Sequence, residues 1–95
     1  MTLQYTPRAI ADLAEIGEYL KSRSPPGAKR VQAAILGTLQ MVVRFPHVGR
    51  LQTLATVRKI GLRSYPYLIY YSVELDEIVV LSIQHGARMQ DYEDA

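Results

Sequence analysis

The 95-residue sequence predicts an α+β domain in which a short N-terminal strand and an antiparallel helical hairpin pack on an antiparallel sheet, in the order β-α-α-β-β-β. In the first half, apolar residues recur every three or four positions, which is the pattern of amphipathic helices. In the second half, three runs rich in Val, Ile and Tyr are joined by short links, which favours an antiparallel meander. A chain of this length builds one core, so we expect a single domain over residues 1–95.

The first strand is expected at Thr2 to Tyr5, at an edge of the sheet. Thr6 can then cap a helix whose first position is Pro7, where the missing N–H costs nothing. The residues expected to form the apolar stripe of this helix are Ile10, Leu13, Gly17 and Leu20.

The second helix begins at Ser24, Pro25 and Pro26 by the same logic. Its buried stripe is predicted to comprise Ala28, Val31, Ile35, Leu39 and Val42. Pro46 should end the helix after Phe45. The short connection between the two helices predicts an antiparallel hairpin.

The three later strands are predicted at Ala55 to Ile60, Tyr67 to Glu74 and Ile78 to Gln84, with a turn at Gly61 to Pro66. The last two strands are apolar on both faces. One set of side chains must face the helices, and the other set needs a cover, for example a partner's chain.

The charges are segregated along the chain although the net charge is only +2. No acidic residue lies between Tyr19 and Val73, where nine of the eleven Lys and Arg residues fall. A basic surface of this kind attracts phosphate backbones or an acidic protein partner, or is simply solvated.

Several classes of chemistry find no support in the sequence. There is no cysteine, there are only two histidines, and no HExxH-like spacing, glycine-rich phosphate loop or nucleophile elbow occurs. We therefore expect no metal and no cofactor. The N-terminus lacks the regions of a signal peptide and no apolar run approaches ~20 residues, so we expect a cytoplasmic protein without a membrane partner.

The ordered set of segments from Val57 to Arg88, VRKIGLRSYPYLIYYSV followed by IVVLSIQHGAR, resembles the RelE/ParE superfamily of bacterial toxins from type II toxin–antitoxin systems. The upstream segments DLAEIGEYL and FPHVGR agree with this resemblance, which covers nearly the whole chain. It implies a growth-inhibiting toxin in a hetero-oligomer with a cognate antitoxin, whose disordered C-terminal segment folds on this protein. The doubly apolar sheet and the pair of helices are the expected docking surfaces.

The RelE branch implies a metal-independent endoribonuclease that cuts messenger RNA on the ribosome, with Arg58, Arg63 and Tyr92 as its catalytic candidates. Tyr92 lies four residues after Arg88, as the RelE spacing requires. The arginine of the RelE aromatic strand, however, falls on Leu68 here, and leucine cannot stabilise a charged transition state.

The ParE branch matches better, through the LIYY strand and the HGAR segment at the end of the last strand. It implies inhibition of DNA gyrase by binding, without chemistry. The ribonuclease remains the alternative, as does a decayed toxin that only binds its antitoxin.

For target or partner binding, the candidates are Arg58, Arg63, His85, Arg88 and Tyr92. Arg58 would contact a phosphate or an acidic partner if it projects from the sheet face away from the helices, and otherwise pairs locally. Arg63 lies in a turn, where functional residues are common. His85 and Arg88 have local hydrogen bonds or ion pairs as their alternative roles, and Tyr92 has packing of the tail.

Two further expectations concern structure. Tyr67, Tyr70 and Tyr71 should serve as core residues or hairpin pairs, with base stacking as the alternative. Arg50 is expected to hold the preceding loop against the sheet.

Overall fold

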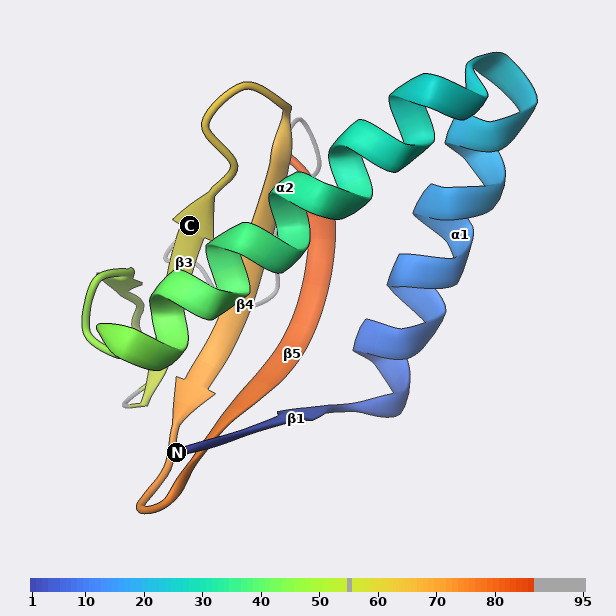
Figure 1. Ribbon diagram of the computed structural model, residues 1–95. Helices are drawn as coiled ribbons and strands as arrows, with labels where there is room; N and C mark the ends of the chain where they lie inside the picture. Colours follow the sequence, from blue (N-terminus) through green and yellow to red (C-terminus); the bar gives the residue numbers. More distant parts are fainter. Residues whose placement is uncertain (55, 87–95) are drawn as a thin grey trace.

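The computed structural model describes residues 1–54 and 56–86 of the chain. Its elements, in chain order, are β1 (Thr2–Tyr5), α1 (Pro7–Arg23), α2 (Pro25–Arg44), β2 (Arg50–Leu51), β3 (Val57–Gly61), β4 (Tyr67–Val73) and β5 (Glu77–His85). The strands form one sheet in the order β1-β5-β4-β3-β2, and α2 crosses one face of it while α1 runs beside β5 (Figure 1). The predicted α+β fold class is confirmed.

Both helices begin at the predicted caps. The Ala9 N–H donates to Thr6 Oγ1 at 3.0 Å, and the Gly27 N–H donates to Ser24 Oγ at 3.1 Å. Each cap satisfies one of the amide groups that the first turn leaves without an intrahelical partner. Ser24 alone separates the helices, which meet there and diverge from one another (Figure 1).

The apolar stripe of α2 is largely as predicted, and the stripe of α1 is confirmed at Leu13 and Leu20, which pack against the core, but not at Ile10. Four of the five predicted α2 positions are buried, namely Val31, Ile35, Leu39 and Val42. On α1, Ile10 was expected to face the core but is 58% exposed, and its neighbour Ala9 is fully buried instead. The small Ala9 side chain lies in the same apolar cluster as Val80 and Ile83 of β5. The core-facing stripe of α1 therefore begins at Ala9 instead of Ile10 and continues through Leu13, Ile16 and Leu20.

The sheet departs from the prediction at its two edges. β1 lies at an edge, as expected, but it pairs with β5 in parallel, so the expectation of a wholly antiparallel sheet is wrong for this strand. The connection from β1 to β5 runs through both helices and strands β2 to β4, and so has the length that a parallel pairing requires. The other edge is the two-residue β2, which pairs with β3 and was not predicted from the sequence.

A β-bulge interrupts the pairing of β4 with β5. Tyr70 lies opposite Ser82 and Tyr71 lies opposite Val80, so Leu81 is the extra residue. A bulge of this kind reverses the alternation of side chains along a strand. Val80 and Ile83 consequently share one core cluster with α2 residues, although strict alternation would place them on opposite faces.

The second face of the sheet is not an open apolar surface. Tyr70 and Ser82, which lie opposite each other in the register, are fully buried within the single chain. A partner chain is therefore not needed to cover this part of the sheet. Neither α1 nor α2, the two helices in the described part of the chain, has the length and apolarity needed to cross a membrane.

Candidate functional site

The loop between α2 and β2 is fastened to the sheet by Tyr71. The Tyr71 hydroxyl accepts a hydrogen bond from the Gly49 N–H at 2.8 Å and donates one to the Pro46 carbonyl at 2.8 Å. Gly49 lies so close that an added Cβ would stand 2.6 Å from the same oxygen. Burial raises the pKa of Tyr71 above its ordinary value, although the Gly49 hydrogen bond and the charge of Arg58 act in the opposite direction. The neutral hydroxyl is thus available as both donor and acceptor.

Arg58 fastens the same loop from β3. Its Nη1 donates to the Gly49 carbonyl at 2.8 Å and to the His47 carbonyl at 3.1 Å. In the register Arg58 lies opposite Tyr71, which belongs to the core beneath α2. Its side chain is therefore on the helix face of the sheet, and the half-buried guanidinium has the local role that the sequence left open as an alternative.

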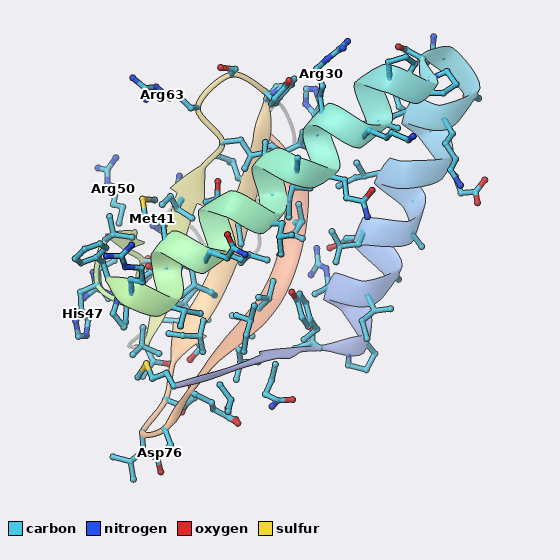
Figure 2. The ribbon with its side chains drawn as sticks, in the orientation of Figure 1. Arg30, Met41, His47, Arg50, Arg63 and Asp76 are labelled. Atoms are coloured by element: carbon cyan, nitrogen blue, oxygen red, sulfur yellow. The ribbon has the colours of Figure 1, made fainter. Side chains whose placement is uncertain are left out.

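Arg50 was expected to hold this loop, but the hydrogen bonds that hold it come from Tyr71 and Arg58. Arg50 is exposed and projects outward beside the end of α2 (Figure 2). Because the register pairs it with Lys59, its side chain belongs to the face opposite Arg58.

The remaining described candidates lie at the other end of β3 and β4. Arg63 is exposed in the turn between these strands, where it points away from the sheet (Figure 2). His85 is exposed at the end of β5, and its ring meets the Tyr67 ring edge-on, with centroids 5.7 Å apart. Arg58, near the start of β3, is not gathered with them. Arg88 and Tyr92 lie outside the described residues.

A cavity of about 370 Å³ adjoins His85, between α1 and the end of β5. The side chains that line it include Asp12, Glu15, Tyr19, Tyr67 and His85. One oxygen of the Asp12 carboxylate accepts a hydrogen bond from the Ile83 N–H at 3.0 Å and lies 4.0 Å from Arg8 Nε. Asp12 thus fastens α1 to β5. Within residues 1–54 and 56–86, no three His, Asp or Glu side chains are grouped as a metal site would require.

A larger cavity, which we call the helix groove, lies between the diverging helices and has a volume of about 560 Å³. Its lining is mostly apolar and includes Leu13, Ile16, Leu20, Val31, Ile35 and Leu36. Leu36 remains 52% exposed. The groove thus presents an apolar surface between the two helices.

The role of Tyr71 as the anchor of the loop was not predicted from the sequence. The pair of helices was expected as a docking surface, but the groove between them was not predicted. Tyr71 was placed in the core from its position in an apolar strand, which is correct for its ring. Its hydroxyl contacts residues 22 and 25 positions away, and no local pattern signals such a pairing. The groove depends on the angle between the helices, which a residue spacing does not determine.

Comparison with known proteins identifies the family. Residues 3–90 match the model of the ParE toxin of the type II toxin–antitoxin system parDE. The chain is 31% identical to the putative toxin Y4kP of Sinorhizobium fredii over 84 residues, covering 88% of this chain and 86% of that protein. It is 34% identical to the toxin RelE2 of Caulobacter vibrioides over 85 residues, covering 90% of this chain and 94% of that protein.

Solved structures agree on the architecture. A structure of the chromosomal ParDE toxin–antitoxin system from P. aeruginosa superposes with a TM-score of 0.77 at 26% identity, covering 90% of this chain and 95% of that one. The toxin–antitoxin complex RelBE of E. coli gives a TM-score of 0.65 at 22% identity, covering 92% and 98%, and shows the shared fold. With the family model matched over most of its length, the chain belongs to the ParE toxins of type II toxin–antitoxin systems.

Proposed function

We propose that this toxin inhibits DNA gyrase by binding to it, without a chemical step, and that a cognate antitoxin neutralises it. The match to the ParE family over residues 3–90 supports a gyrase inhibitor, following the implication of the sequence resemblance. One observation favours an inhibitor over a nuclease: Arg58 donates hydrogen bonds to the loop carbonyls of His47 and Gly49.

Cleavage of RNA through the 2′-hydroxyl requires a proton acceptor and cations placed together at the reacting phosphate. Among the described candidates, Arg58 is committed to the loop, whereas Arg63 and His85 lie towards the opposite end of the strands. Leu68 occupies the position where the RelE pattern has an arginine. The described residues therefore support a binding surface better than a catalytic centre.

A ribosome-dependent ribonuclease is the second candidate function, favoured by the 34% identity to a protein named toxin RelE2. The two candidates differ in what the purified chain does. A gyrase inhibitor slows supercoiling by purified gyrase and, when induced alone in bacteria, arrests growth and activates a DNA-damage reporter. A ribonuclease cuts ribosome-bound messenger RNA and leaves both the reporter and the supercoiling reaction unchanged.

For the antitoxin, we propose that a helical segment docks in the helix groove. The groove is apolar, has the volume given above and leaves Leu36 exposed at its margin. An amphipathic segment that folds into such a groove contributes apolar contacts at intervals of three and four residues. Its ordering entropy is offset by the apolar area that it buries.

Leu36→Ser tests this docking. It removes an exposed apolar contact from the groove and leaves the core intact, so antitoxin affinity should fall by about tenfold. Ile10→Ser is the matched control, because Ile10 is also exposed on a helix but does not line the groove. Affinity for the purified antitoxin, measured by calorimetry, should fall only for Leu36→Ser. Equal affinities for both variants would contradict the groove as the docking site.

A further inference from the structure

From Met41 to Leu51, around the C-terminal end of α2, exposed apolar and basic side chains follow one another closely along the chain. We call this surface the α2-end patch, and it comprises Met41, Arg44, Phe45, His47, Val48 and Leu51. Its four apolar members are 39%, 58%, 47% and 55% exposed in chain order. Figure 2 shows Met41 and His47 near the end of the helix, with Arg50 beside them. Single exposed apolar residues are ordinary, but a cluster of this kind marks an interaction surface.

The loop within the patch is held rigidly. Tyr71 and Arg58 together make four hydrogen bonds to the backbone of Pro46, His47 and Gly49. Between these anchored positions, the side chain of Val48 points to solvent, as does that of Phe45 just before them. A buried hydroxyl and a half-buried guanidinium thus fix a loop whose apolar side chains are left outside the core. A surface held in one conformation loses little entropy when it binds.

The charge around the patch selects an acidic partner. Arg44 lies over the Phe45 ring, with its guanidinium carbon 5.7 Å from the ring centroid, and Arg50 flanks the patch. No acidic residue occurs in the sequence from Tyr19 to Val73 that supplies these side chains. A second copy would bring two basic surfaces together, which is unfavourable. The four apolar side chains favour a protein surface over a phosphate backbone, because phosphate contacts require donors and charge.

The patch and the helix groove share no residue. The groove lining from α2 ends at Leu39, and the patch begins at Met41. We infer that the α2-end patch binds an acidic, partly apolar protein surface on the target of the toxin, while the antitoxin occupies the helix groove. This inference rests on the proposed function.

The test compares an apolar variant, Phe45→Ser with Val48→Ser, and a charge variant, Arg44→Gln with Arg50→Gln. Both change exposed side chains, so circular dichroism and thermal unfolding should confirm that the fold is retained. The expected result is loss of growth arrest and binding to purified gyrase weakened about tenfold or more in both variants, because such anchors dominate interface energies. Affinity for the purified cognate antitoxin should change less than about threefold. Ile10→Ser is the control and should behave as wild type in all three assays.

The possible results separate this inference from the proposed function. If the wild-type chain arrests growth and both patch variants arrest it equally, the patch is not the target surface, although the toxin assignment stands. Antitoxin binding lost in folded patch variants would assign the patch to the antitoxin and overturn the inference. Loss of target binding in the charge variant alone would indicate a nucleic-acid surface, which also overturns it. A wild-type chain that neither arrests growth nor binds gyrase or ribosomes would refute both proposals.

Discussion

Removing the Tyr71 hydroxyl should cost the protein a large part of its stability. Tyr71→Phe keeps the buried ring and deletes one bond to the Gly49 N–H and one to the Pro46 carbonyl. Each such bond contributes about 1 kcal/mol net, and a buried donor left without a partner costs about 1 kcal/mol more. Gly49 is buried, so its amide incurs this further cost. The free energy of unfolding should therefore fall by about 2–4 kcal/mol.

Urea denaturation measures this loss directly, and thermal unfolding provides a second value. For a domain of this size, about 1 kcal/mol corresponds to roughly 4–8 °C in Tm, so the midpoint should drop by about 10 °C or more. Hydrogen exchange at the Gly49 amide should also become faster than in wild type, because the bond that protects it is gone.

Tyr19→Phe is the matched control, since Tyr19 is 53% exposed and its substitution should change stability by less than about 0.5 kcal/mol. A change in Tyr71→Phe as small as that of the control would refute the reasoning. It would mean that water replaces both loop bonds without cost, and that the hydroxyl does not fix the loop.

Three more changes test the same structure. Gly49→Ala places a Cβ 2.6 Å from the Tyr71 hydroxyl and should destabilise by about 1–3 kcal/mol in urea denaturation; an unchanged midpoint would show that the loop moves aside freely. Thr6→Ala removes both the cap of α1 and the bond from Thr6 Oγ1 to the Leu81 carbonyl, and should lower the unfolding free energy by about 1–2 kcal/mol, whereas no loss would contradict the cap. Burial raises the pKa of Tyr70 to about 12, so the unfolded chain releases this proton more readily than the folded chain. The contribution of Tyr70 to the free energy of unfolding is present below about pH 10 and is lost as the pH rises towards 12. Urea denaturation at a series of pH values should detect this decline, and Tyr70→Phe should reduce it.

The helix boundaries could be predicted because their determinants are local. Thr6 and Ser24 each accept a bond from the amide three residues ahead, and each precedes a proline that fits the first helical turn. The position of Pro46 after Phe45 ends α2 for the same short-range reason. Chemistry within one turn of helix is visible in the sequence.

The failures arise where distant segments meet. Ile10 has the spacing of a core residue, but its neighbour Ala9 occupies the core beside β5 and Ile10 is exposed. The bulge at Leu81 reverses the faces of the second half of β5, and the apolar composition of the strand gives no sign of it. The two-residue β2 exists because the loop before it is fastened to β3 and β4 by Arg58 and Tyr71.

For the candidate site, the sequence identified the basic middle of the chain but not which of its arginines remain available. Arg58 had the residue type and the strand position of a functional group, yet its Nη1 is used within the chain. Arg50 was expected to be structural and is exposed beside the α2-end patch. A count of charges treats both alike, because only the fold determines which guanidinium is committed to backbone carbonyls.

The spacing along α2 shows how an antitoxin in the helix groove can block a target at the α2-end patch without contacting it. Leu36 and Phe45 are nine positions apart, which corresponds to about 13 Å along a helix axis. A bound helix is itself about 10–12 Å across, and the folded domain that carries it is wider still. Nine positions are also about two and a half turns, which places the two side chains on opposite sides of the helix axis. In the proposed arrangement, a large target is therefore excluded by the width of the antitoxin domain around α2 and not by contact at Phe45. The antitoxin and the target can thus exclude each other although they contact different residues. Substitutions in the patch should therefore remove toxicity while antitoxin binding is retained.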